Sequence, residues 1–167
     1  ALLRAVAADR ILAYRDHIVQ MTAQTGKDAR KRWDQICKAL DVDNHPTQFE
    51  AYRSKGSECL TYRRTGSRLM PFAPTPKSIH GDSLNLVMID EAWAFDEESG
   101  DALIAAVNPT FATVLDNQLW IVSTKGTAKS AYLNRLISQG RAAVNDPHSR
   151  TAYFEWSADP ELAAQDP

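Results

Sequence analysis

Cysteine is scarce in this sequence, and this limits the kinds of site that the chain can build. Among 167 residues there are two cysteines, Cys37 and Cys59, and they stand far apart. They lack the paired spacing of zinc ligands, and one pair cannot form the disulfide framework of a small secreted domain. We therefore expect two reduced thiols and neither a zinc site nor a disulfide.

The sequence also lacks an excess of charge of either sign. Nineteen basic side chains face 21 acidic ones, giving a formal net charge of −2. The chain as a whole does not attract phosphate backbones, so contact with nucleic acid would need a local basic patch. Two basic clusters stand out, although solvated surface is the simpler interpretation of each. They comprise Lys27, Arg30, Lys31 and Arg32, and Arg63, Arg64 and Arg68.

No long uncharged apolar run is present at the start of the chain. Residues 1–14 carry Arg4, Asp9 and Arg10 among their apolar neighbours, which excludes a signal peptide and a membrane span there. We expect a cytoplasmic protein. With 44% hydrophobic residues, the chain can bury the core of one globular domain.

Helical and strand-like patterns alternate along the chain. Helical spacing predicts helices over 1–16, from a Thr25 cap to about residue 40, over 96–107, and from the segment after residue 126 up to Gly140, with Ala131, Leu133, Leu136 and Ile137 facing inward. Short apolar runs predict strands at 17–23, 84–89, 118–122 and 151–156. Asp28 and Arg32 have the spacing of an i,i+4 ion pair, and Trp93 and Trp120 are expected in the core.

Residues 48–73 follow a different pattern. Three short alternating runs are broken at Lys55-Gly56 and Thr65-Gly66, which predicts a small antiparallel meander. The alternation elsewhere is typical of an α/β fold with a mainly parallel sheet flanked by helices. We expect one domain that combines this sheet with the meander.

Two adjacent acids close the apolar strand at 84–89. Asp90 and Glu91 would lie at the carboxyl end of a parallel strand, where open α/β sheets bind ligands. In a nucleotide-hydrolysing P-loop protein, Asp90 would hold Mg²⁺ and Glu91 would orient the attacking water. Strand alternation would point the two side chains to opposite sides. Taken alone, the pair could equally be a polar exit from a strand.

A second polar strand end follows about thirty positions later. Ser123, Thr124, Lys125 and Gly126 come directly after the apolar run QLWIV. Hydroxyl groups beside the carboxylates could sense a γ-phosphate, and Ser123 or Thr127 could instead cap the next helix. The two interpretations are compatible.

In their order and spacing, these blocks resemble the terminase large subunits of tailed phages and prophages. The similarity lies in LMPFAPTPKSIHGDSLNLVMIDEAWAF, in NPTFATVLDNQLWIVSTKGTAKSAYL and in MTAQT at 21–25. It implies a P-loop NTPase fold of the ASCE type. It also implies that Asp90 and Glu91 are the Walker B acid and the catalytic glutamate, and that Ser123, Thr124, Lys125 and Gly126 form the motif that couples hydrolysis to DNA movement. His80-Gly81 is similar to a structural step in the family.

The resemblance also implies a function and a set of partners. The intact protein would be an ATPase motor that uses ATP with Mg²⁺ to move double-stranded DNA into a procapsid. It would act in the host bacterial cytoplasm, as a homo-oligomeric ring, with a portal protein and a small terminase subunit. The resemblance assigns neither the DNA-contacting residues nor an arginine finger.

The sequence departs from the family pattern in one respect. No segment of it matches G-x-x-x-x-G-K-[ST], the loop that holds nucleotide phosphates. In the family this loop precedes the first helix, which would place it upstream of Ala1. Residues 1–157 are therefore expected to form an N-terminally incomplete ATPase domain that binds ATP weakly or not at all. Residues 158–167 would begin the linker toward a nuclease domain that these residues do not include.

Two other functions stay open. A helicase-like P-loop ATPase would use the same acids, although the order of the motifs fits it less closely. A non-catalytic prophage remnant or binding module would be equally consistent with the missing loop.

Overall fold

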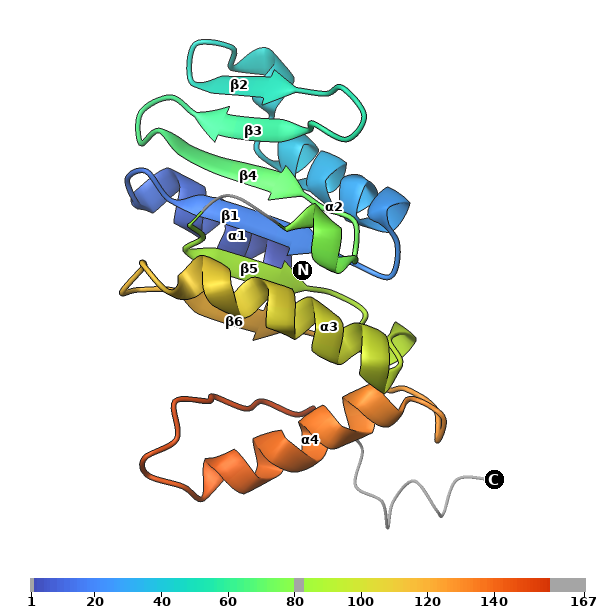
Figure 1. Ribbon diagram of the computed structural model, residues 1–167. Helices are drawn as coiled ribbons and strands as arrows, with labels where there is room; N and C mark the ends of the chain where they lie inside the picture. Colours follow the sequence, from blue (N-terminus) through green and yellow to red (C-terminus); the bar gives the residue numbers. More distant parts are fainter. Residues whose placement is uncertain (1, 80–82, 157–167) are drawn as a thin grey trace. The chain divides into compact units, whose positions relative to one another are not determined.

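A computed structural model describes residues 2–79 and 83–156 of the chain. Four consecutive strands lie between the second and third α-helices, and helices alternate with strands in the rest of the chain (Figure 1). The helices and strands are α1 (Leu2–Ala13), β1 (Ile18–Thr22), α2 (Gly26–Ala39), β2 (Phe49–Tyr52), β3 (Cys59–Tyr62), β4 (Ser67–Pro71), β5 (Leu86–Ile89), α3 (Glu97–Val107), β6 (Gln118–Ile121) and α4 (Ala131–Val144).

The strands form one six-stranded sheet in the order β2-β3-β4-β1-β5-β6. Strands β4, β1, β5 and β6 are parallel to one another, whereas β3 is antiparallel to both β2 and β4. The predicted fold class, a mainly parallel sheet with a small antiparallel part, is confirmed. The meander is continuous with the main sheet, because β4 pairs in parallel with β1, from Ile18 opposite Arg68 to Met21 opposite Pro71.

Glycines close both turns of the antiparallel part. Gly56 lies between β2 and β3 with φ of 82°, and Gly66 lies between β3 and β4 with φ of 74°. Side chains other than glycine rarely adopt these angles. The breaks predicted at Lys55-Gly56 and Thr65-Gly66 are therefore turns, as the sequence indicated.

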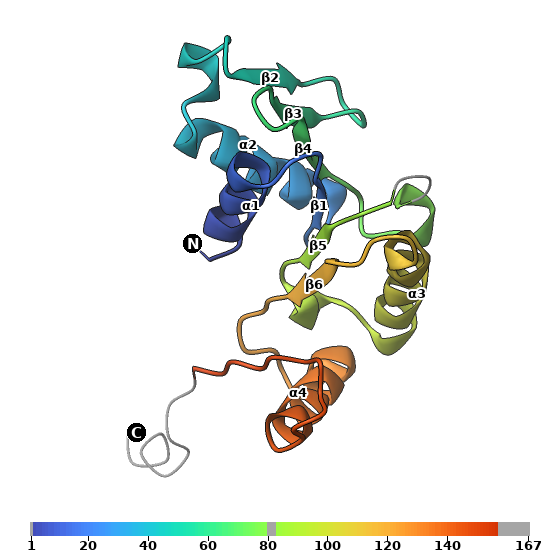
Figure 2. The same cartoon turned by 90° about the vertical axis from the view of Figure 1, so that its left-hand side faces the viewer.

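Helices cover both faces of the sheet. Figure 2 shows α1 and α2 on one side and α3 on the other. The core beneath α1 and α2 contains Trp33 and Ile36 of α2, both almost fully buried, together with Val19 of β1 and Leu69 of β4. The Trp33 indole also donates a hydrogen bond to the carbonyl oxygen of Leu69, at 3.0 Å. The central strand β5 is buried at all four positions, which explains its continuous apolar sequence.

The α2 helix begins as predicted. The Thr25 hydroxyl accepts a hydrogen bond from the backbone N–H of Asp28 at 3.1 Å and donates one to the Asp28 carboxylate at 2.6 Å. Such a cap satisfies a backbone donor that the helix leaves open. The structure gives Asp28 this partner in place of the i,i+4 partner Arg32, so the predicted pair is wrong.

The chain divides into two compact units at residues 133 and 134. In the first unit, Tyr132 and Leu133 are buried and Ala131 is exposed, which corrects the predicted inward position of Ala131. In the second unit, the Arg141 guanidinium holds the Glu155 carboxylate through two hydrogen bonds, of 2.9 and 2.7 Å.

The strand predicted at 151–156 is wrong, because these residues have no regular secondary structure. The aromatic side chains that suggested a strand, Phe154 and Trp156, are exposed and stack on each other with ring centroids 6.2 Å apart. An apolar run therefore did not indicate a buried strand here.

Both cysteines are free thiols, as predicted. Burial raises the pKa of the Cys37 thiol to about 12, so it stays protonated at neutral pH. Within residues 2–79 and 83–156, no helix has the length and apolar character needed to cross a membrane.

Candidate active site

Three parallel strands bring their carboxyl ends to one edge of the sheet. The backbone N–H of Asp90 donates to the carbonyl oxygen of Thr22 at 3.0 Å, and the N–H of Ala92 donates to that of Val122 at 3.3 Å. These bonds tie the segment after β5 to the ends of β1 and β6. The polar residues that follow the strands thus lie side by side, at the edge where open α/β sheets bind ligands.

The backbone turns sharply directly after β5. Glu91 adopts the left-handed conformation, with φ of 61° and ψ of 44°. This conformation is uncommon for a residue with a side chain, and it tends to occur at functional sites. The turn ends the strand alternation, so the prediction that Asp90 and Glu91 point to opposite sides is wrong. Both carboxylates instead reach the same partner.

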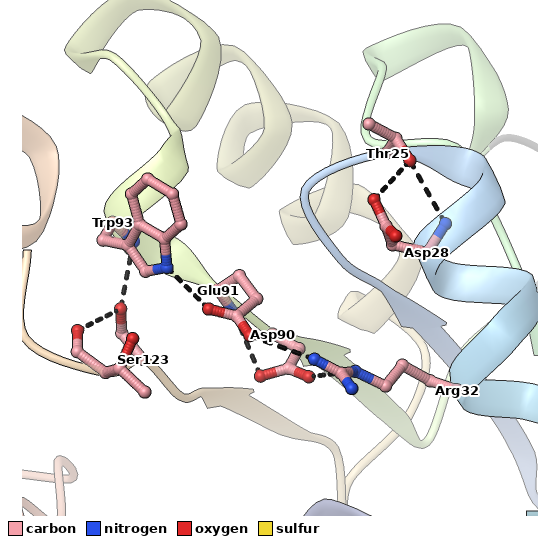
Figure 3. A network of polar contacts seen from close by, with 8 residues as sticks. Thr25, Asp28, Arg32, Asp90, Glu91, Trp93 and Ser123 are labelled. Atoms are coloured by element: carbon pink, nitrogen blue, oxygen red, sulfur yellow. Dashed lines mark hydrogen bonds and ion pairs between the residues drawn. The ribbon is translucent and has the colours of Figure 1, made fainter. Parts of the chain in front are cut away.

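That partner is Arg32, which lies about two turns into α2. Its Nε donates to Asp90 Oδ2 at 2.8 Å, and its Nη2 donates to Glu91 Oε1 at 3.0 Å (Figure 3). One guanidinium therefore bridges the two acids through charge-assisted hydrogen bonds. The interpretation of Arg32 as ordinary solvated surface is wrong, because its side chain is partly buried against the acid pair.

The second oxygen of each acid is also engaged. Asp90 Oδ1 accepts the backbone N–H of Glu91 at 3.0 Å, and Glu91 Oε2 accepts the indole N–H of Trp93 at 2.5 Å. Each of the four carboxylate oxygens therefore has a donor. Both acids are therefore held by hydrogen bonds on each of their oxygens.

Trp93 connects the acid pair to the end of β6. Its indole donates to Glu91, and its backbone N–H donates to Ser123 Oγ at 3.0 Å (Figure 3). The Ser123 hydroxyl in turn donates to the carbonyl oxygen of Thr124 at 2.8 Å. Trp93 is half-buried, whereas Trp120 packs against the main core as predicted. A chain of contacts thus runs from Arg32 through Glu91 and Trp93 to Ser123.

The rest of the Ser123–Gly126 segment is less enclosed. Thr124 and Lys125 are exposed, and Gly126 is half-buried. A Cβ atom at Gly126 would lie 2.6 Å from Ser130 Oγ, closer than non-bonded atoms normally approach. Glycine therefore permits the close approach of this segment to the start of α4. The helix-capping interpretation of Ser123 is not what the structure shows, since its hydroxyl binds Trp93.

The donor set at this edge suits a hard cation. Asp90 and Glu91 supply carboxylate oxygens, and a guanidinium cation already binds them. The part of the chain that the structure describes contains no cluster of three or more metal-ligating side chains. In nucleotide sites, Mg²⁺ is commonly held by one or two carboxylates together with the phosphates of the nucleotide. Asp90 and Glu91 fit that kind of ion.

Sequence reasoning missed two residues of the site. Arg32 was assigned to a surface cluster, and Trp93 was assigned to the core. Arg32 and Asp90 are 58 positions apart, so only the packing of α2 against β1 and β4 brings them together. The expected His80-Gly81 step lies outside the described residues.

Comparison with known proteins identifies the fold through similar solved structures. No family model and no curated protein matches this sequence. Among solved structures, the large terminase of bacteriophage HK97 is similar over 95% of this chain and 33% of its own, with a TM-score of 0.73 and 16% sequence identity. This chain thus spans about a third of the length of that protein.

Two further structures agree with this result. The large terminase of a thermophilic bacteriophage, solved in complex with ADP, matches 81% of this chain and 34% of its own at 14% identity and a TM-score of 0.58. The large terminase ATPase domain of the Thermus phage P74-26 matches 75% of this chain and 55% of its own at 19% identity and a TM-score of 0.54. The chain has the fold of phage large terminases.

Proposed function

We propose that this chain is the acid-bearing part of a terminase motor domain, which couples ATP hydrolysis to the movement of double-stranded DNA into a procapsid. The observation that carries the proposal is the pair Asp90 and Glu91, placed by a fully buried strand at the ligand-binding edge of a terminase fold. ATP and Mg²⁺ are the cofactors of this proposal. The terminase of the thermophilic bacteriophage, which shares the fold, was solved with ADP and with ATP-gamma-S.

The two acids have different roles in this proposal. Asp90 would hold Mg²⁺, directly or through water, and the ion would supply the positive charge that neutralises the phosphates. Glu91 accepts a hydrogen bond from the attacking water and so orients it. The left-handed backbone of Glu91 and the indole of Trp93 position its carboxylate for that task.

Ser123, Thr124, Lys125 and Gly126 form the coupling segment. Support comes from the contact between the Ser123 hydroxyl and the backbone of Trp93, whose indole binds Glu91. A change in the position of Glu91 during hydrolysis would be passed through Trp93 to this strand end. The exposure of Thr124 and Lys125 leaves the segment accessible to a DNA-gripping element.

The phosphate-binding loop is proposed to precede Ala1, because no G-x-x-x-x-G-K-[ST] segment occurs in the 167 residues. Residues 1–157 would then be one part of the ATPase domain, and residues 158–167 the start of a linker. The portal protein, the small terminase subunit, assembly as a ring and action in the host cytoplasm belong to the same proposal.

The alternative function is a prophage remnant or binding module without catalysis, with which the missing loop is equally compatible. The gene sequence upstream of Ala1 separates the two functions. A Gly-rich loop ending in Lys-Ser or Lys-Thr supports the motor, whereas an upstream region without it supports the remnant. A helicase-like ATPase is separated by substrate, since it would unwind duplex DNA while a packaging motor moves it intact.

The direct test is ATP hydrolysis by the gene product that includes this upstream region, with and without double-stranded DNA. We expect DNA to stimulate hydrolysis and the Glu91→Gln variant to lose at least about a hundredfold in rate, since a water-positioning group is removed. Equal rates for the variant and the native protein would show that Glu91 is not the catalytic acid. Absence of hydrolysis in both would favour the binding module.

A further inference from the structure

We propose that Arg32 is a positioning residue that acts as the resident counter-ion of the acid pair and is exchanged for a divalent cation. This inference rests on the proposed function, because it concerns the control of the same two acids. It makes α2 part of the site, although none of the sequence motifs lies in this helix. Arg32 would hold Asp90 and Glu91 in a resting arrangement until the cation displaces it.

The first argument is that one guanidinium blocks both acids at once. Arg32 binds Asp90 Oδ2, where a cation would bind, and Glu91 Oε1, where a water would be held. The other two oxygens are bound within the turn itself, by the Glu91 backbone and by the Trp93 indole. Departure of Arg32 therefore frees one oxygen for the cation and one for the water, and leaves both acids anchored.

The second argument is that Arg32 can leave without unfolding the protein. Its side chain is 34% exposed, compared with 17% for Asp90 and 25% for Glu91. Its backbone lies in a helix whose buried face holds Trp33 and Ile36 in the core. A long side chain that starts from a fixed helix and ends near solvent can change rotamer at small cost.

The third argument is charge. Two adjacent carboxylates that share one guanidinium keep a net negative charge, and a divalent cation would neutralise it fully. Without Arg32 the two carboxylates would repel each other, which favours binding of any cation that replaces it. Removal of Arg32 should therefore strengthen metal binding, whereas a residue with a structural role alone would weaken it or leave it unchanged.

The test is the binding of Mn²⁺, as a probe for Mg²⁺, to the 167-residue chain in the absence of nucleotide. Free Mn²⁺ is measured by electron paramagnetic resonance during a titration. We expect Arg32→Gln to bind Mn²⁺ about tenfold more tightly than the native chain. The factor corresponds to about one charge-assisted hydrogen bond that Mn²⁺ no longer has to break between Arg32 and the acid pair. Arg32→Lys, which keeps the charge but cannot bridge two carboxylates, should lie between them.

Lys31→Gln is the matched control. It removes the same charge from the neighbouring position of the same helix, where the side chain is exposed. A screened surface charge should change the affinity by less than about twofold. Asp90→Asn combined with Arg32→Gln should abolish the tight binding, which assigns it to the acid pair. Addition of Mg²⁺ should also shift the nuclear magnetic resonance signal of the Trp93 indole proton, because its acceptor Glu91 is released from Arg32.

The outcomes separate the inference from the proposed function. If Arg32→Gln and the native chain bind Mn²⁺ equally at Asp90, or if Lys31→Gln strengthens binding as much as Arg32→Gln, the exchange is wrong and the motor proposal stands. If Arg32→Gln binds no Mn²⁺ at millimolar concentration, the exchange is wrong. The hydrolysis assay then decides the motor proposal, because Mg²⁺ in that proposal binds together with nucleotide phosphates. If Arg32→Gln does not fold, the comparison between Arg32→Lys and Lys31→Gln decides in the same way.

Discussion

Polar side chains gather at both ends of the parallel strands. At the amino ends Ser67 and Asn85 bind backbone groups, whereas at the carboxyl ends Arg32, Asp90 and Glu91 bind one another. At the amino ends, Ser67 Oγ accepts the N–H of His17 at 2.9 Å and donates to the carbonyl oxygen of Tyr14 at 2.7 Å. Asn85 Oδ1 accepts the N–H of Ile18 at 2.9 Å. At the carboxyl ends, Arg32, Asp90 and Glu91 form a charged cluster.

We propose that the difference separates polar groups with a structural role from those with a functional role. A buried backbone group loses its hydrogen bond to water when the chain folds. A side chain that binds this group replaces the lost bond and so stabilises the fold. Two acids that depend on a cation for compensation contribute little to the fold and stay available to a ligand. Substitution at the amino ends should therefore reduce stability and spare activity, and substitution at the carboxyl ends should do the reverse.

The largest loss of stability is expected for Ser67→Ala. Ser67 is fully buried, and its removal leaves the His17 N–H and the Tyr14 carbonyl without their partner. We expect the free energy of unfolding to fall by about 2 kcal/mol, measured by urea denaturation of the 167-residue chain. Ser57→Ala, at an exposed position, is the control and should change stability little. A fall in the free energy of unfolding of less than about 0.5 kcal/mol for Ser67→Ala would show that polar groups at the amino ends of the strands do not stabilise the fold.

A smaller loss of stability is expected for Thr25→Ala. This residue lies at the carboxyl ends of the strands but has a structural role, so it is an exception to the comparison between the two ends. Thr25 follows β1 at the carboxyl edge, yet its hydroxyl binds the backbone of Asp28 and caps α2. Loss of the cap should cost about 1 kcal/mol in unfolding free energy. Mn²⁺ binding should stay unchanged, because the helix that carries Arg32 keeps its place. Loss of metal binding would show that Thr25 belongs to the site.

The smallest effect is expected from the titration of His17 at the amino edge. Burial lowers its pKa from 6.5, since desolvation disfavours the charged imidazole, while Asp116 at 3.2 Å acts in the opposite direction. The unfolded chain therefore binds a proton at higher pH than the folded chain. The stabilising contribution is present above the unfolded pKa and is lost as the pH falls from 6.5 through the folded pKa.

This prediction is checked by unfolding at about pH 8 and about pH 5, on either side of the ordinary histidine pKa, with His17→Gln as the control. The native chain should lose more stability between the two pH values than the variant does. The opposite order would mean that the pair with Asp116 outweighs burial and that the pKa is raised.

Sequence patterns predicted the strand ends better than the contacts between them. Asp90, Glu91 and Ser123 could be placed because an apolar run defines a strand and the next polar residue marks its end. The bridge by Arg32 could not be predicted, because it depends on the placement of α2 over the sheet and on the left-handed turn at Glu91. The strand expected at 151–156 failed because strand-like residues do not by themselves provide a pairing partner, and Phe154 and Trp156 are exposed and stack on each other.

Side-by-side measurement of Glu91→Gln and Ser67→Ala in the gene product that includes the region upstream of Ala1 tests the central claim most directly. Each variant is assayed for DNA-stimulated ATP hydrolysis per folded molecule and for its free energy of unfolding. We predict that Glu91→Gln loses at least about a hundredfold in hydrolysis with little change in stability, and that Ser67→Ala loses stability but keeps its turnover. Equal hydrolysis by Glu91→Gln and the native protein, or an equal loss in both variants, would contradict the assignment of the active site to the carboxyl edge.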